Sequence, residues 1–274
     1  MIGGSIAVAL AQARATIPVS EARQLLRHVL GCTAAYLEAH RDEPLSEEAA
    51  ARFSALVERR AAGEPVAYLT GSREFYGREF AVSPDVLIPR PETELLVELA
   101  ITQLRGTKSP RLLDLGTGSG CIAVTLALEL ENADVTAVDV SPQGLLLARR
   151  NAERHGAVVR CLQSNWFESL DATRYQLIVA NPPYIGSEDP HLGRGALRFE
   201  PSQALAAGAD GLAAIRCIVA TAARYLVAGG GLWFEHGHDQ AQSARAVLET
   251  AGFAGIEQHR DLAGIVRVSG GFRP

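Results

Sequence analysis

The sequence is poor in the residues that build disulfide frameworks and metal sites. Its 274 residues include four widely spaced cysteines that form no Cys-x-x-Cys pair: Cys32, Cys121, Cys161 and Cys217. Two of its seven histidines, His236 and His238, lie close together, and their spacing of two residues directs them to opposite faces of a strand. We therefore expect free thiols in the reducing cytoplasm and no metal site.

Long apolar runs and a stripe of basic residues are also lacking. No apolar run approaches the roughly 20 residues that cross a membrane. The weakly apolar first 18 residues lack the basic leader of a signal peptide, and we interpret them as a helix. The net charge of −5 is spread along the chain, whereas nucleic-acid-binding proteins usually display a basic stripe. We therefore expect neither a membrane nor a stable nucleic-acid partner.

Residues 1–74 have the apolar pattern of a small helical domain. Between Ser20 and Gly31 apolar residues recur at helical spacing, with Ser20 as the expected N-cap and Gly31 as the stop. Residues 46–63 repeat the pattern, with an acidic start and a basic end that suit a helix dipole. We predict a substrate-docking domain here, and a purely structural role explains the same pattern.

From residue 75 onward the pattern changes twice. Residues 75–90 alternate as a β-hairpin linker would, within a stretch that changes character from residue 65. Residues 91–274 then alternate between helices and strands, beginning with a helix over 91–104. This order predicts an α/β fold with a doubly wound, mostly parallel sheet and a last antiparallel strand. The long connection 185–210 has no helical or strand period, and we expect it to bind substrate.

A glycine-rich turn closes the first strand of that domain. Asp114 and Leu115 precede Gly116, Thr117, Gly118, Ser119 and Gly120, after which a helix is expected from Ser119 to Leu130. Glycines permit the tight turn and let backbone N–H groups approach a nucleotide-like cofactor. Asp139 ends the next strand, 19 residues past Gly120, where its carboxylate can accept hydrogen bonds from ribose hydroxyls. A capping role for Asp139 is less favoured because Ser141 can cap the following helix.

The glycine spacing distinguishes between cofactors. The turn reads G-x-G-x-G after an acid, with no basic residue to meet a pyrophosphate, and this disfavours a nicotinamide-dependent oxidoreductase. It resembles the first motif of class I S-adenosylmethionine-dependent methyltransferases. That resemblance implies S-adenosylmethionine as cofactor and places Trp166 beside the adenine. It leaves open whether Asn165, which stands where an acid is commoner, contacts the adenine.

A second motif, Asn181-Pro182-Pro183-Tyr184, follows the buried strand predicted over residues 175–180. Two prolines fix two φ angles and remove two backbone donors, leaving carbonyl acceptors on a stiff turn. Such a turn suits a planar group with an NH2, whose face can stack on Tyr184. Alone, however, the prolines would be ordinary turn punctuation.

Together these motifs resemble the HemK/PrmC family, the glutamine N5-methyltransferases that modify peptide-chain release factors. The resemblance runs through PVAYLTGSREFYG (65–77), LIPRPETE (87–94), DLGTGSG (114–120), NPPY (181–184), RFEPSQAL (198–205) and FEHG (234–237). It implies that the target is the glutamine of a Gly-Gly-Gln loop, with the cofactor bound along residues 116–120 and by Asp139, Trp166 and Asn181. Asn181 and Pro182 would then be catalytic, and residues 181–184 would bind the substrate. The helical domain and the 185–210 loop would hold the release factor.

Two other functions share parts of this pattern. A methyltransferase of exocyclic amines, such as adenine N6 in DNA or RNA, would use the same turn, but base flipping needs a basic groove. A non-catalytic S-adenosylmethionine-binding or scaffold protein is disfavoured by the intact N-P-P-Y motif together with Asp139. The sequence leaves open whether Glu200 and His236 contact substrate or stabilise a loop, and which release factor is preferred.

Overall fold

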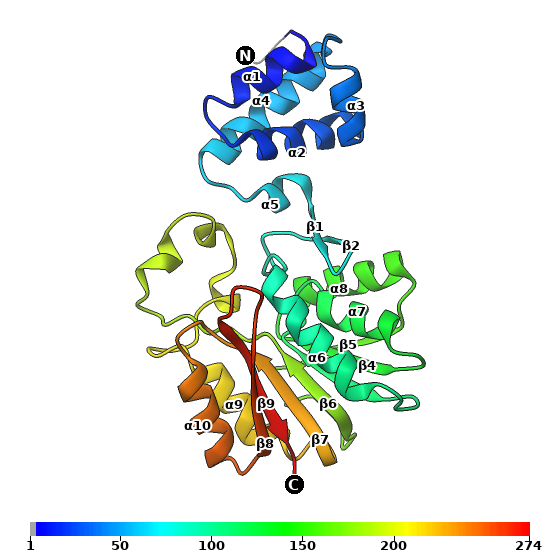
Figure 1. The fold of residues 1–274 in the computed structure, drawn as a ribbon, viewed down its shortest axis with the longest axis vertical. Coiled ribbons are helices and arrows are strands. Elements are labelled where there is room, and N and C mark those ends of the chain that lie inside the picture. Colours follow the sequence, from blue (N-terminus) through cyan, green and yellow to red (C-terminus); the bar gives the residue numbers. More distant parts are fainter. Residues whose placement is uncertain (1–3) are drawn as a thin grey trace. The chain divides into compact units, whose positions relative to one another are not determined.

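The computed structural model describes residues 4–274, which divide into two compact units, Met1–Ser72 and Arg73–Pro274 (Figure 1). The first unit is helical, with α1 (Ile6–Ala13), α2 (Val19–Leu30), α3 (Ala34–Ala39), α4 (Glu47–Ala61) and α5 (Val66–Thr70). Its core includes Leu25, Leu26 and Phe53, which are fully buried. Glu21 of α2 accepts two hydrogen bonds from Arg60 of α4, at 2.7 and 3.0 Å, so the two longest helices are tied by a bidentate ion pair.

The expected end of α2 is confirmed and its expected start is wrong. Gly31 has a φ of 61° and caps the C-terminus in the left-handed conformation. The N-cap, however, is Pro18, and Ser20 lies inside the helix because the helix begins at Val19. The fixed φ of Pro18 makes it suitable for the helix start without a side-chain cap.

The hairpin of the second unit lies earlier than the predicted 75–90. It consists of β1 (Ser72–Phe75) and β2 (Arg78–Ala81). The two residues between them, Tyr76 and Gly77, have φ values of 50° and 69°. Positive φ at both central positions defines the tight turn that matches the twist of paired strands, and this turn sets the hairpin. No helix or strand covers residues 82–90.

The main sheet has seven strands in the order β5-β4-β3-β6-β7-β9-β8. They are β3 (Arg111–Leu115), β4 (Asp134–Asp139), β5 (Val159–Gln163), β6 (Tyr175–Ala180), β7 (Leu226–Glu235), β8 (Ala254–Arg260) and β9 (Val266–Phe272). The first five strands in this order, β5, β4, β3, β6 and β7, pair in parallel. Strand β9 lies between β7 and β8 and is antiparallel to both. The predicted doubly wound sheet with an antiparallel strand is therefore confirmed.

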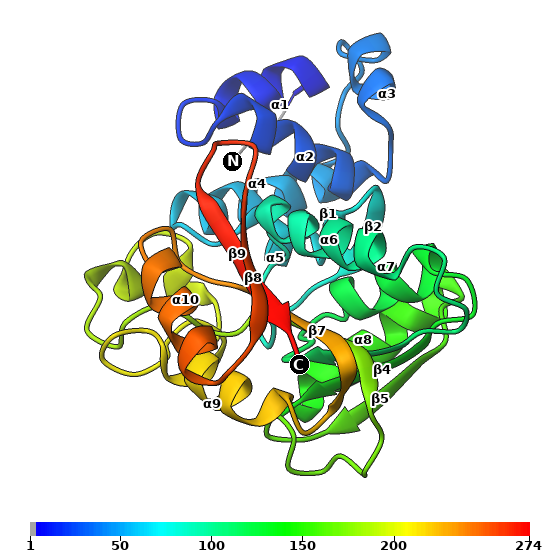
Figure 2. The same cartoon turned by 60° about the horizontal axis from the view of Figure 1, so that its bottom comes forward.

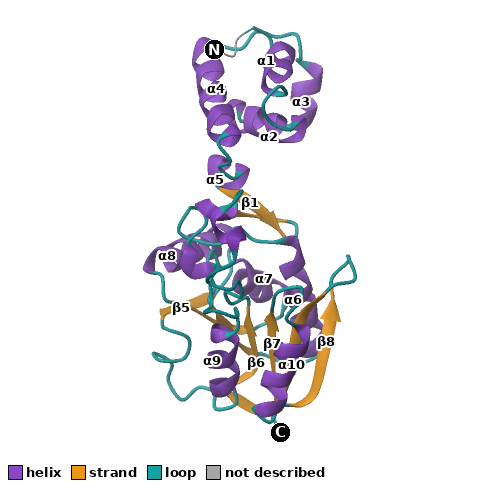
Figure 3. Ribbon diagram, turned by 90° about the vertical axis from the view of Figure 1, so that its left-hand side faces the viewer, coloured by secondary structure: helices purple, strands orange, loops and turns teal. Residues whose placement is uncertain are grey.

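Helices cover both faces of this sheet (Figures 2 and 3). Side chains of α6 (Glu94–Leu104), α7 (Cys121–Glu129) and α8 (Pro142–His155) join one core cluster. Those of α9 (Ala213–Ala222) and α10 (Ala241–Thr250) join the other. Neighbouring residues of β3 divide between the two clusters, Leu112 on one side and Leu113 on the other. Because alternate residues of a strand point to opposite faces, the near-continuous apolar strands follow from burial on both sides.

Helix starts in this unit depend on glycine, proline and serine. A short 3₁₀ turn over Pro91–Thr93 precedes α6. The helix expected from Ser119 begins at Cys121 because Gly120, with a φ of 81°, is its N-cap. Ser141 caps α8 as expected, since its side chain accepts a hydrogen bond from the N–H of Gly144.

The connection 185–210 contains three short 3₁₀ turns, Pro190–Gly193, Leu197–Phe199 and Ser202–Ala204. A single bridge joins Ile185 to Ala206 and brings its two ends together. Across residues 4–274, none of the helices combines the length and the apolar character needed to cross a membrane.

Candidate active site

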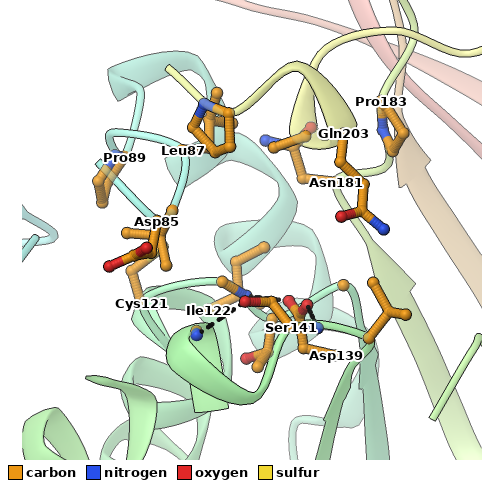
Figure 4. A pocket seen from close by; sticks show the side chains of 18 of the residues that line it. Asp85, Leu87, Pro89, Cys121, Ile122, Asp139, Ser141, Asn181, Pro183 and Gln203 are labelled. Carbon is orange, nitrogen blue, oxygen red and sulfur yellow. Dashed lines mark hydrogen bonds between the residues drawn. The ribbon is translucent and has the colours of Figure 1, made fainter. Parts of the chain in front are cut away.

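A cavity of about 450 Å³ opens in the second unit at the carboxyl ends of the parallel strands (Figure 4). Leu115 of β3 is in register with Val138 of β4 and Ala180 of β6, so the turns that follow these strands meet at one edge. This edge is where open α/β sheets bind ligands. The wall comprises residues 84–87, 89, 93, 116–118, 121–122, 139–141, 144, 164–166, 181, 183, 201 and 203–204.

The glycine-rich turn forms one side of the cavity. Gly116, Thr117 and Gly118 line it, whereas Ser119 and Gly120 do not. Gly116 and Thr117 both donate their N–H groups to the carbonyl of Val138, at 2.9 and 3.0 Å. Gly116 and Gly118 have φ values of 72° and 53°, which glycine adopts at low cost. These two hydrogen bonds fix the turn to the carboxyl end of β4.

Gly120 has a packing role behind the turn. A Cβ atom at this position would lie 3.0 Å from the Cβ of Ala148 in α8, and the φ of 81° already disfavours any side chain. Ser119 is buried, and its carbonyl accepts a hydrogen bond of 2.8 Å from the Asn151 amide. These two residues therefore join the turn to α8 rather than facing the cavity.

Asp114, at the end of β3, is buried beneath the same turn. The Thr117 hydroxyl donates to its Oδ2 at 2.6 Å. Burial raises the pKa of Asp114 to about 7, with opposing contributions from hydrogen bonds of Thr117 and the Ala123 backbone. Near neutral pH this carboxyl group therefore changes charge.

Asp139 lies on the floor of the cavity, next to Ser141 (Figure 4). Its Oδ1 accepts from the N–H of Ser141 and its Oδ2 from the N–H of Gly118, both at 2.8 Å. These two bonds fix the carboxylate, and an ionised carboxylate has about four acceptor sites. Asp139 therefore keeps capacity for two hydroxyl donors, as ribose recognition requires.

Trp166 and Asn165 line the wall formed after β5. Trp166 has a φ of 52°, and its ring would be 3.4 Å from a Cβ atom at Gly116. The absence of a side chain at Gly116 therefore leaves the ring room beside the turn. The amide of Asn165 donates to Glu168 at 2.8 Å, so one of its donors is already engaged.

Asn181 brings an amide to the opposite wall. Its Nδ2 donates to the hydroxyl oxygen of Thr93 at 3.0 Å, and Thr93 donates to Glu235 Oε2 at 2.6 Å. The Oδ1 of Asn181 is buried, with no hydrogen-bond partner among residues 4–274. A buried amide oxygen without a donor costs about 1–3 kcal/mol, so this atom is suited to accept from a bound group.

The other residues of the second motif are placed differently from one another. Pro183 lines the cavity, whereas Pro182 is buried and Tyr184 is also absent from the wall. The Tyr184 hydroxyl donates to Glu235 Oε1 at 3.0 Å. Burial and the Glu235 carboxylate raise the pKa of Tyr184, so this hydroxyl keeps its proton and stays a donor.

The two residues whose roles the sequence left open have structural partners. Glu200 is buried and accepts from the N–H of Ile88 at 3.1 Å and from the Arg90 guanidinium, which ties the 185–210 loop to the segment before α6. His236 is also buried, with its ring nitrogens 2.8 Å from the Gly237 carbonyl and the Ser269 hydroxyl. Burial lowers the pKa of His236, which therefore stays neutral between β7 and β9.

Sequence reasoning missed Thr93, Glu235 and the wall formed by residues 84–89. Thr93 and Glu235 belong to the LIPRPETE and FEHG segments, which carried the resemblance without a role. The available signal was Thr93 itself, a hydroxyl residue in the first turn of a helix beside two prolines. Residues 84–89 were interpreted as part of a linker, and residues 84–87 and 89 instead line one side of the cavity (Figure 4).

The fold and the cavity define a class I methyltransferase. A 16S rRNA methyltransferase of T. thermophilus, solved with S-adenosylmethionine and guanosine, superposes with a TM-score of 0.57 at 22% identity, covering 74% of this chain and 50% of that chain. Residues 5–71 match the PrmC N-terminal domain and residues 91–193 the methyltransferase small domain.

Two curated relatives identify the family. The release factor glutamine methyltransferase of Bordetella pertussis is 54% identical over 257 residues, which cover 93% of this chain and 95% of the relative. That of Burkholderia pseudomallei is 54% identical over 261 residues, which cover 93% of this chain and 92% of the relative. The chain belongs to the release factor glutamine methyltransferase family.

Proposed function

We propose that this chain methylates the side-chain amide nitrogen, N5, of a release-factor glutamine at the cavity wall where Asn181 lies. Family membership supports the reaction, with S-adenosylmethionine as the methyl donor. The observation that supports the location is the buried Asn181 oxygen, which has no donor among residues 4–274. Asn181 lines the same cavity as the glycine-rich turn.

The residues around the turn fit the cofactor. S-adenosylmethionine, when bound, supplies an electrophilic methyl group on a positively charged sulfur. Asp139 would accept hydrogen bonds from the ribose hydroxyls, and Trp166 would cover the adenine. The backbone carbonyls of Gly116 and Gly118 would accept from the ammonium group of the amino-acid part, because the N–H groups of residues 116–118 already donate to Val138 and Asp139 and the two glycines place no side chain in the way.

The amide target explains why acceptors are needed at the second motif. The lone pair of a carboxamide nitrogen is delocalised into its carbonyl, so the nitrogen is a poor nucleophile. We assign the Oδ1 of Asn181 to accept one N–H bond of the glutamine amide, and the backbone carbonyl of Pro182, which lies between the wall residues Asn181 and Pro183, to accept the other. Two fixed acceptors orient the nitrogen toward the methyl group, and such positioning and preorganised dipoles supply much of the rate.

The rest of the chain would hold the partner. We assign the target to the Gly-Gly-Gln loop of class 1 release factors, a loop tip that a strand-exit cavity can admit. The helical unit and residues 185–210 would bind the body of the release factor. The net charge of −5 favours a protein partner over a stable nucleic-acid partner, and a chain that acts on a translation factor would work in the cytoplasm.

The test is a transfer assay with S-adenosylmethionine labelled on its methyl group. Purified protein should label class 1 release factors, should not label a factor whose Gly-Gly-Gln glutamine is replaced by alanine, and should not label DNA or RNA. Labelling of nucleic acid in place of the release factor would establish the exocyclic-amine alternative.

The cofactor assignment has a matched pair of variants on one strand. Asp139→Ala at the cavity end of β4 should weaken S-adenosylmethionine binding at least about tenfold, since two hydroxyl acceptors are lost. Asp134→Ala, at the opposite and exposed end of the same strand, should leave the affinity unchanged. Calorimetric titration measures both, and equal affinities would place the ribose elsewhere.

A further inference from the structure

Four side chains from three segments of the second unit form one hydrogen-bonded chain that ends at the cavity. Asn181 follows β6, Thr93 precedes α6, Glu235 ends β7, and Tyr184 lies in the second motif. The bonds run from Asn181 Nδ2 to Thr93, from Thr93 to Glu235, and from Tyr184 to Glu235, at 3.0, 2.6 and 3.0 Å. Asn181 and Thr93 also line the cavity.

While Glu235 is ionised, it sets the direction of donation in this chain. An ionised carboxylate accepts only, so the Thr93 hydroxyl must point its single hydrogen at Glu235. The Thr93 oxygen is then left as an acceptor and pairs with the NH2 of Asn181 rather than with its oxygen. The amide of Asn181 is therefore held with its Oδ1 away from Thr93, and this is the buried atom that has no partner among residues 4–274.

We propose that Thr93 and Glu235 are positioning residues, which hold the Asn181 amide with its oxygen, not its NH2, presented to the substrate amide. This inference rests on the proposed function, because the substrate glutamine offers donors that only an oxygen can accept. With the amide turned over, the NH2 of Asn181 would face the NH2 of the glutamine, and two donors cannot pair.

Both carboxylate oxygens of Glu235 have hydrogen-bond donors. It is buried, and each of its oxygens accepts one hydroxyl hydrogen. Burial raises the pKa of Glu235, and the nearby Glu92 adds to this, whereas the hydrogen bonds from Thr93 and Tyr184 and the charge of Arg267 favour the ionised form. Protonation would add a donor at Glu235 and allow Thr93 to turn its own hydrogen toward Asn181, which would reverse the chain.

The first test removes one hydroxyl. Thr93→Val keeps the shape of the side chain and should lower kcat about 10–100-fold, because the Asn181 amide loses its fixed partner. The KM and the calorimetric Kd for S-adenosylmethionine should stay unchanged, and Thr93→Ser should restore kcat. The control is Thr125→Val in α7, since Thr125 is also fully buried and its hydroxyl lacks a partner among residues 4–274.

The second test uses the pH profile and does not depend on the stability of the Thr93 variants. In the parent protein kcat should fall as pH falls and Glu235 takes up a proton. Glu235→Gln should have a lower kcat, because a glutamine can either accept from Thr93 or donate to it at any pH. The fall of kcat at low pH, the acid limb of the profile, should be absent in this variant. Thr125→Val should keep the limb.

The outcomes separate this inference from the proposed function. Wild-type kcat in Thr93→Val, a parallel loss of cofactor affinity, or an unchanged acid limb in Glu235→Gln would each overturn the positioning role. Wild-type turnover in Asn181→Ala, or the absence of release-factor methylation by the parent protein, would instead overturn the proposed function itself.

Discussion

Asn181 is the residue on which the chemistry of the cavity is most directly tested. Asn181→Ala removes one of the two acceptors proposed for the glutamine amide, and single-turnover methyl transfer should slow at least about 100-fold. Binding of S-adenosylmethionine should change little, because Asp139 and the 116–118 backbone are untouched. A variant with near-parent turnover would remove Asn181 from the mechanism.

Asp114 gives a prediction about the pH dependence of stability. Its pKa in the folded protein is about 7, above the ordinary value of 3.8, so the folded state holds a proton that the unfolded chain releases. The stability from this proton is complete below the ordinary pKa and is lost as pH rises through about 7. Asp114→Asn removes this slope and can still accept from Thr117.

The melting temperature of Asp114→Asn should therefore rise relative to that of the parent protein as pH goes from about 5 to about 8. Thermal unfolding without cofactor measures the difference at each pH. A difference that stays constant over this range would mean that the Asp114 carboxyl is ionised throughout.

At the level of single residues, the sequence predicted the site residues that directly follow strands. It did not predict the residues that hold those site residues in position. Asp139 and Asn181 could be named because the end of a parallel strand faces the ligand edge. Glu235 and Thr93 are 142 residues apart and meet only through the packing of α6 and β7 onto β6. No spacing in the sequence encodes such a contact.

At the level of elements, apolar periodicity predicted the strands and helices of the second unit, while backbone conformation decided their ends. The hairpin moved to 72–81 because Tyr76 and Gly77 both have positive φ, and α7 starts at Cys121 because Gly120 is its cap. The loop over 185–210 was predicted as irregular. Its attachment could not be, since Glu200 pairs with residues more than 100 positions earlier.

That attachment leads to a prediction for the loop. Glu200→Ala leaves the N–H of Ile88 without its acceptor and Arg90 without its carboxylate, and should cost about 1–3 kcal/mol. Residues 185–210 should exchange amide hydrogens faster, and KM for the release factor should rise with little change in cofactor affinity. Glu188→Ala, at an exposed site of the same loop, is the control, and equal exchange in the two variants would contradict the anchoring role.

At the level of the whole molecule, the two units divide the proposed work. Every residue of the cavity wall lies within Arg73–Pro274, which also contains both sheet-covering cores. A fragment of residues 73–274 should therefore bind S-adenosylmethionine with the affinity of the full chain. Its KM for the release factor should rise at least about tenfold if Met1–Ser72 docks the partner, whereas an unchanged KM would leave that unit a structural role.

The position of β9 constrains how a nascent chain can mature. This strand follows β8 in the sequence yet lies between β7 and β8, so β8 has no sheet neighbour until residues up to 272 have left the ribosome. Until then β7, whose last residue is Glu235, presents an unpaired edge of the kind that recruits other strands. Completion of the sheet beyond β7 therefore waits for the segment 266–272, and a ribosome stalled before it would hold an intermediate with an exposed, aggregation-prone edge.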